Sequence, residues 1–368
     1  MQQFSVQVHW YGNMIRKIFN IQKNIFWAGL LLAQFVLFRI FATHSFFINI
    51  ADHFFEWRKN LQPKLFAWLP FSAGDILYLL FGIYILYALL LFLLQRKKRY
   101  LRKILIALNI FYFTYQTFWG LLYFQKPISE NLPETEITNA QIEFLTEKYL
   151  QRCIEDRRHV KENSLGIFEI SDKAALTADI LQNQKNIPHF ITGKSKIKTI
   201  NIKPSLYSRI MSDTGILGYY NPFTSEVQFN PHLPDTYIPF TLAHESAHQI
   251  GFAREQEANF IGFLMGKNAK NPDLKYSTDY FVLKNLLNYY ADKNPGYVRH
   301  ILQKYPTGMK RDRLNEKAFA KRHEGWLDRF FGISNDLFLK SNKQEGSVTY
   351  SYFINLLIQY EQDVYIKK

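Results

Sequence analysis

The stretch His244-Glu245-Ser246-Ala247-His248, which leads within seven residues to Glu255-Gln256-Glu257-Ala258-Asn259, decides how this chain is interpreted. On an α-helix, residues four positions apart lie on the same face, so both imidazoles can reach one metal ion. Glu245 then lies beside them, where it can act as a general base toward water. A random ordering of the same residues contains H-E-x-x-H in roughly 1% of cases, so the pattern is informative by itself.

Apolar residues on both sides of the motif favour a helix that packs against a core. Ile238, Phe240 and Leu242 precede it, and Ile250 and Phe252 follow it. This spacing is typical of a helix with one buried stripe. The histidine pair is therefore predicted to lie on a partly buried helix.

A third metal ligand is expected shortly after the motif, because a catalytic zinc usually has three protein ligands and one position for water. Gly251 permits the chain to turn, and a second helix beginning near Ala253 would return a carboxylate to the metal. Glu255 and Glu257 are the two candidates. A third histidine in the H-E-x-x-H-x-x-G-x-x-H spacing is excluded, because that position is Arg254 and a guanidinium does not bind zinc.

Three apolar stretches occupy the first third of the chain, at about residues 25–42, 75–94 and 104–124. Each has about 17 to 21 residues, the length that crosses a hydrocarbon core of about 30 Å. A signal peptide is a weaker interpretation of the first stretch, because Arg39 lies inside it and further apolar stretches follow. We expect a membrane region over residues 1–125 with a bundle of three transmembrane helices, followed by a soluble domain over residues 126–368.

The net charge of +14 is concentrated around these apolar stretches. Residues 1–125 contain 13 Lys and Arg against 3 Asp and Glu, whereas residues 126–368 contain 32 against 28. This distribution indicates a lipid bilayer as partner and argues against nucleic acid. The basic block at 96–103 predicts a cytoplasmic loop, and three crossings then place the soluble domain outside. Arg58, Lys59 and Lys64 in the first loop weaken that assignment.

The soluble part is predicted to be mainly α-helical with a small β-sheet. Thr138 and Gln141 have the spacing of a capping box at the start of a helix that ends near residue 156. Residues 197–202 alternate as a short strand, turn residues within 215–231 indicate a hairpin, and the strand at 226–230 is a candidate to align a peptide by edge pairing. Further helices are expected at 174–184, 259–265, 280–290, 298–302 and 348–360.

The two motifs together resemble the glutamate zincins, in which a helix reading E-x-x-A-[D/N] follows the H-E-x-x-H helix. The resemblance implies that Glu255 is the third zinc ligand and that Asn259 supports a ligand histidine, with Glu257 as the fallback ligand. The interval between His248 and Glu255 is shorter than is usual in that group, which requires a tight connection.

Longer stretches resemble an uncharacterised bacterial family of multi-pass membrane proteins known only as a domain of unknown function (DUF3810). They lie at residues 203–208, 218–224 and 244–260, at Asn335-Asp336 and at 346–350. The resemblance covers most of the soluble part. It implies a zincin-like metallopeptidase fold with a metal site and a location in the bacterial inner membrane, and it names no substrate.

These features predict a membrane-anchored zinc metallopeptidase that cleaves a peptide or protein substrate on the periplasmic side. His244, His248 and Glu255 would hold Zn²⁺, and Glu245 would be the catalytic base. Tyr220, Tyr276 and Tyr280 are candidates to support an oxyanion, although packing is the commoner role of tyrosine.

The alternative is a non-catalytic, zinc-stabilised envelope protein that serves as a binding or scaffold module. Glu245 speaks against it, because a structural zinc site needs no general base. An intramembrane protease is disfavoured because charged residues flank the motif.

Overall fold

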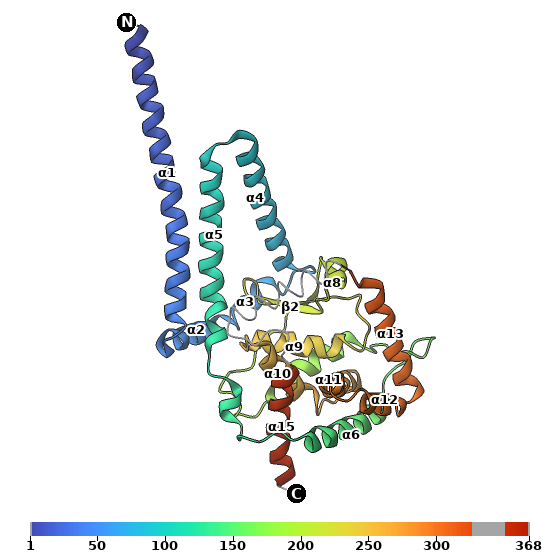
Figure 1. Cartoon of the computed structure of the whole chain (residues 1–368). Helices are drawn as coiled ribbons and strands as arrows, with labels where there is room; N and C mark the ends of the chain where they lie inside the picture. The colour runs from blue at the N-terminus through green and yellow to red at the C-terminus, as the bar shows by residue number, and fades with distance from the viewer. Residues whose placement is uncertain (1, 326–349, 367–368) are drawn as a thin grey trace. The chain divides into compact units, whose positions relative to one another are not determined.

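The computed structural model describes residues 2–325 and 350–366, with side chains over 22–325 and 352–362. The chain divides into two compact units. The first comprises Met1–Ala51 and Gly74–Leu121, and the second comprises Asp52–Ala73 and Leu122–Lys368. The predicted combination of many helices with a small sheet is confirmed (Figure 1).

Three long helices make up most of the first unit, α1 (Gln2–Phe41), α4 (Ala73–Gln95) and α5 (Lys98–Phe118). Helix α5 packs along α1. Asn109 is a polar residue within the apolar part of α5, and its amide donates to the carbonyl oxygen of Trp27 at 3.0 Å and accepts from Gln34 at 3.2 Å. A polar side chain in an apolar helix is thus hydrogen-bonded to the neighbouring helix.

Among the described residues, two helical segments are long and apolar enough to cross a membrane, Gln22–Phe41 and Ala73–Gln95. The prediction of three such helices is therefore corrected to two. The stretch expected at 104–124 is not one helix, because α5 ends at Phe118 and Gly120–Phe124 form a 3₁₀ turn, η1. Leu122 and Tyr123 are buried in the second unit, so the last apolar residues of this stretch belong to a protein core.

The sheet of the second unit has three short strands in the order β1-β3-β2. Strands β2 (Gly218–Asn221) and β3 (Glu226–Phe229) form the predicted hairpin, and β1 (Ile202–Pro204) pairs in parallel with β3. Strand β1 begins where the strand expected at 197–202 was predicted to end. Because β3 is central, the prediction that residues 226–230 offer a free edge is wrong, and β2 is the edge strand beside β3.

Helix α9 (Ile238–Ile250) is the centre of the second unit and is buried along most of its length. It packs against β2 and β3 on one side and against α10 (Glu255–Gly266) and α11 (Pro272–Tyr290) on others (Figure 1). The capping box of Thr138 and Gln141 is confirmed at the start of α6. Asn335 and Asp336 lie outside the described residues. The other helical elements are α6 (Asn139–Asp156), α7 (Lys173–Asn183), α8 (Ser208–Thr214), α12 (Pro295–Gln303), α13 (Thr307–His323), α15 (Tyr350–Ile366), η2 (Ile128–Asn131) and η3 (Gln184–Asn186).

Residues 52–73 pack with the second unit, whereas the sequence places them in the membrane region. They contain the end of α2 (Ser45–Arg58) and the short helix α3 (Gln62–Phe66). The buried ammonium of Lys59 donates to the carbonyl oxygen of Ile250 at the end of α9, and Gln62 donates to the carbonyl oxygen of Pro222. The predicted domain boundary at residue 126 therefore assigns residues 52–73 to a different domain from the one they pack with. The sequence does not reveal this packing, because the residues in contact are far apart along the chain.

Candidate metal centre

The two histidines of the motif lie one turn apart on α9, as their spacing predicts. Their ring centroids are 4.8 Å apart and the rings are almost perpendicular. Ala243 and Ala247 are fully buried on the same helix, so small side chains let α9 approach its neighbours closely. The helix ends at Gly251, whose φ of +115° is in the left-handed region that favours glycine.

Helix α10 begins four residues after Gly251 and carries Glu255 at its first position. One carboxylate oxygen of Glu255 lies 3.2 Å from Nε2 of His244, and the other lies 3.6 Å from Nε2 of His248. The short connection after Gly251 is therefore sufficient to bring this carboxylate back to both imidazoles.

The Nδ1 atom of each histidine faces a hydrogen-bond acceptor. Nδ1 of His244 lies 2.8 Å from Oδ1 of Asn259, and Nδ1 of His248 lies 2.6 Å from the carbonyl oxygen of Phe252. Because these oxygens can only accept, Nδ1 carries a proton in both rings, and Nε2 of each ring lies on the side of Glu255. Such outer partners orient histidine ligands at many metal sites.

Glu257 is held in a different contact. Its carboxylate accepts from the backbone N–H of Ile128 at 3.0 Å and from Arg254 at 3.0 Å, and the residue is buried. Arg254 also donates to the carbonyl oxygen of Tyr123. Of the two glutamates that the sequence offers, the structure brings Glu255 to the histidines and uses Glu257 to hold the start of α10 against the preceding linker.

Glu245 is buried beside the histidine pair, and the nearest donor atoms of His244, Glu245 and His248 lie within 4.8 Å of one another. Its Oε2 atom has no hydrogen-bond partner among the described residues. A Cβ atom at Gly218 would lie 3.0 Å from Cγ of Glu245, so strand β2 begins directly beside this carboxylate. The histidines thus have two carboxylates near them, and Glu255 makes the shorter contact.

The charges of the cluster depend on one another. Burial raises the pKa of Glu245, and the two histidines partly offset that rise. Burial by itself lowers the pKa of His248, but the nearby carboxylate of Glu255 outweighs it and raises the value to about 9. For Glu255, burial raises the pKa, and the imidazoles of His248 and His244 outweigh that effect and hold it well below its usual range. The carboxylate of Glu255 is therefore negatively charged and lies between the Nε2 atoms of His244 and His248.

These residues fit a zinc ion. Two imidazole nitrogens and one carboxylate are a common donor set for catalytic zinc. The buried Oε2 atom of Glu245, which has no partner within the described part of the chain, points to a polar group that the protein itself does not supply. The side chain of Glu255 is 37% exposed, so the cluster is open to solvent on that side.

The three tyrosines considered as oxyanion partners have structural contacts. The hydroxyl of Tyr220 lies 2.8 Å from Oγ of Ser225, and the hydroxyl of Tyr276 donates to Asp312 at 2.8 Å. Tyr280 is buried and stacks on Tyr276. Their contacts agree with a packing role.

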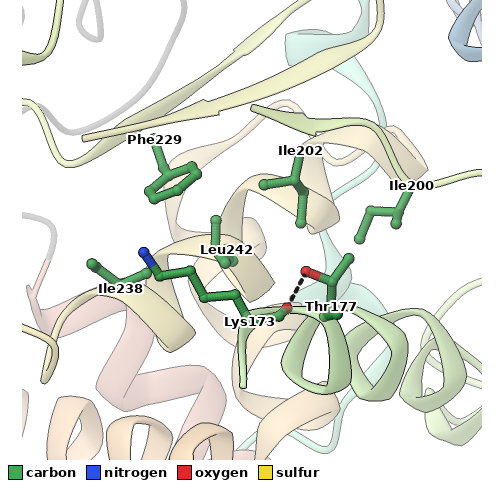
Figure 2. Close-up of a pocket in the computed structure, with 8 residues that line it drawn as sticks. Lys173, Thr177, Ile200, Ile202, Phe229, Ile238 and Leu242 are labelled. Atoms are coloured by element: carbon green, nitrogen blue, oxygen red, sulfur yellow. Dashed lines mark hydrogen bonds between the residues drawn. The ribbon is translucent and has the colours of Figure 1, made fainter. Parts of the chain in front are cut away.

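A pocket of about 290 Å³ lies away from this cluster, between the start of α7, the sheet and the N-terminal half of α9. Figure 2 shows its lining, in which the hydroxyl of Thr177 donates to the carbonyl oxygen of Lys173. Ligand sites are often found in such pockets. None of the residues of the metal cluster lines it, so the chemistry of the donor groups, and not the pocket, identifies the candidate site. The lining residues are Lys173, Ala174, Thr177, Ile200, Ile202, Phe229, Ile238 and Leu242.

Several residues that shape the site were not predicted from the sequence. The carbonyl oxygen of Phe252 leaves no sequence signal, because every residue has a carbonyl. Arg254 was considered only as a position where a third histidine is missing, whereas it anchors α10. Lys59 supports the end of α9 from a distant segment, and a charged residue between aromatic ones was the only signal that it offered.

Comparison with known proteins identifies a family for this chain. A family model described as "Protein of unknown function (DUF3810)" matches residues 51–358. The chain belongs to the DUF3810 family. No curated protein and no solved structure matches it. The DUF3810 match begins at residue 51, one residue before the second unit, so it includes residues 52–73 as well as the candidate metal ligands.

Proposed function

We propose that this DUF3810 protein is a membrane-anchored, zinc-dependent metallopeptidase. The observation that carries the proposal is the position of the Glu255 carboxylate, 3.2 Å and 3.6 Å from the Nε2 atoms of the two motif histidines. His244, His248 and Glu255 would hold the metal, and Asn259 would orient His244.

Glu245 would be the catalytic base of this site. When bound, zinc would supply Lewis acidity toward water and toward the carbonyl of the scissile peptide. Glu245 would accept a proton from the attacking water and deliver it to the leaving amine. Burial raises the pKa of this carboxyl, which makes it a stronger base than an exposed glutamate.

Strand β2 supports a peptide as the substrate. It is the edge strand beside β3, and it begins next to Glu245. An extended peptide paired with such an edge would be hydrogen-bonded along its backbone, independently of its side chains. This arrangement would place the peptide alongside the base.

The metal content of the purified full-length protein tests the proposal. We expect about one zinc per chain in the wild type and in Glu245→Gln, and strong loss in Glu255→Gln, because three ligands hold a catalytic zinc and the base is not one of them. Glu257→Gln is the matched control two residues away and should keep its zinc. A wild type without zinc would contradict the proposal, and loss only in Glu257→Gln would move the third ligand.

The alternative is a non-catalytic zinc-stabilised protein that binds partners in the envelope, and the open coordination position separates it from a peptidase. A hydroxamate needs a free position on the metal, which a structural site with four protein ligands does not have. In the cobalt-substituted protein we expect a hydroxamate to change the visible absorption spectrum. An unchanged spectrum, together with no cleavage of a mixed peptide library, would favour the alternative.

Chain connectivity limits how the two candidate membrane helices can be arranged, although α5 is not one of them. Residues 52–73 and the segment that starts at Leu122 belong to one compact unit, so both must lie on the same side of a bilayer. If α4 crosses, the chain must cross back before Leu122, and α5 is the helix that lies between. The hydrogen bonds of Asn109 to α1 explain how α5 can carry an amide, because polar groups within a bundle face other helices.

In this topology the second unit would lie outside the cytoplasm. The basic loop between α4 and α5 would be cytoplasmic. The basic residues of the first loop no longer oppose this assignment strongly, because Arg58 and Lys59 are buried in protein contacts and Lys64 alone of the three is exposed. Reporter fusions test this arrangement. A reporter that works only outside the cytoplasm should be active after Lys368 and silent after Gln95, and the reverse pattern would invert the topology.

A further inference from the structure

Residues 57–71 carry a row of exposed apolar side chains. Trp57, Leu61, Leu65, Trp68 and Phe71 are all exposed, and Trp68 is the most exposed at 76%. Trp57 lies in the last turn of α2, Leu61 and Leu65 lie at the start of and within α3, and Trp68 and Phe71 follow α3. An apolar surface of this kind on a soluble unit marks an interaction site.

The opposite side of this segment is buried against the second unit. Phe55 is 1% exposed, and a Cβ atom at Gly251 would lie 2.7 Å from its ring. Lys59 donates to the carbonyl oxygen of Ile250, and Asn60 accepts from the backbone N–H of Lys198. The segment is therefore held to the second unit by Phe55, Lys59 and Asn60, whereas the apolar residues named above remain exposed.

The chain itself indicates what covers the exposed face. The segment ends at Ala73, where α4 begins, and α4 has the higher mean hydropathy of the two candidate membrane helices, at 2.6. Phe71 is thus only two residues from a helix that would enter the bilayer. Tryptophans at both ends, leucines between them and an exposed Lys64 are the composition of helices that lie in the interface between lipid headgroups and acyl chains.

We propose that the exposed face of residues 57–71 lies in the headgroup region of the bilayer and holds the metal-binding unit against the membrane surface. The proposal rests on the membrane attachment proposed above. Phe55 and Lys59 of the same segment contact the end of α9, the helix that carries the two histidines. The candidate metal site would therefore be connected to the lipid surface through this segment.

Site-specific labelling of the full-length protein in lipid vesicles tests this surface. Leu61, Leu65 and Trp68 are changed to cysteine one at a time and labelled with an environment-sensitive fluorophore. Native Cys153 is fully buried, and unlabelled wild type verifies that it does not react. We expect a blue shift of the emission at all three positions and loss of most of its intensity when the vesicles contain lipids that carry a quencher near the headgroup.

Two controls make the outcome decisive. Leu165→Cys reports on an apolar residue of the second unit that is 70% exposed and should remain unquenched, whereas Leu86→Cys reports on α4 and should be quenched by lipids labelled deeper in the acyl chain. If positions 61, 65 and 68 behave like 165 while 86 is quenched, the interfacial surface is refuted and membrane attachment stands. If 86 is also unquenched, membrane attachment itself fails and this inference fails with it.

Discussion

Two glutamates in one sequence pattern have different roles at the scale of single residues. Residues two positions apart on a helix point to different faces, so Glu255 and Glu257 cannot both reach the histidines. Glu255 faces the Nε2 atoms, and Glu257 accepts from Arg254 and from the backbone of the linker. Arg254 and Glu257 contact each other and the linker at the start of α10, and Glu255 faces the cluster from the same turn.

Asn259 should influence the metal through His244 alone. Asn259→Ala removes the acceptor that lies 2.8 Å from Nδ1 of His244. Loss of such a partner typically lowers metal affinity by about 10- to 100-fold. Competition with a chelator of known affinity measures the change. Asn259→Asp retains an oxygen acceptor and should keep most of the affinity, whereas equal losses in both variants would show that the hydrogen bond is not the cause.

At the scale of elements, the site depends on how closely α10 approaches α9. This helix pair has the most extensive contacts between elements of the second unit. Gly262 faces the backbone of His244, and a Cβ atom there would lie 3.1 Å from the backbone nitrogen of that residue. Backbone atoms in a helix cannot move aside as a flexible side chain can, so the absence of a side chain at Gly262 sets the distance between the helices.

Gly262→Ala should therefore push α10 away from α9 and separate Glu255 from the histidines. We expect a loss of about 1–3 kcal/mol in the free energy of unfolding, as for other overpacked cores, together with weaker zinc binding. Chemical denaturation and metal titration measure the two effects. Gly193→Ala is the matched control, because no described residue other than its two chain neighbours has an atom within 4 Å of a Cβ atom there. Unchanged zinc affinity in Gly262→Ala would show that the distance between α9 and α10 does not control zinc binding.

At the scale of the whole molecule, the second unit, which contains the histidine cluster, is assembled from two separate parts of the chain. Residues 52–73 and those from Leu122 onward form one unit, although helices α4 and α5 separate them in the sequence. Phe55, Lys59 and Gln62 are buried only because the two parts are together. The free energy of unfolding of a domain is small, so even these few contacts contribute a significant part of it.

A chain that begins at Leu122 should therefore be unstable, even though it contains every residue of the cluster. We expect a lower melting temperature and weaker zinc retention than in a chain that joins residues 52–73 to 122–368 through a flexible linker. Lys59→Met in that linked chain should lower the melting temperature again in part, because the carbonyl oxygen of Ile250 then lacks its donor. Equal melting temperatures with and without residues 52–73 would show that the docked segment is dispensable.

The sequence by itself determined the features that depend on neighbours along the chain. The spacing of His244 and His248 predicted two imidazoles on one helix face, because helix geometry fixes the positions of residues four apart. The capping box at Thr138 and the hairpin of β2 and β3 were predicted correctly for the same reason. The family to which the chain belongs was also recognisable from its ordered motifs.

Only the tertiary structure decided what depends on contacts between distant segments. The apolar stretch at 104–124 looked uniform in sequence, yet its last residues are buried in the second unit and its helix ends at Phe118. Lys59 was indistinguishable from an ordinary loop charge until its contact with Ile250 was seen. The sequence motif already favoured Glu255 over Glu257, and only the structure showed that Glu257 contacts Arg254 and the backbone of Ile128 instead. Local spacing sets the direction of a side chain on its helix, but packing against remote parts of the chain sets what that side chain meets.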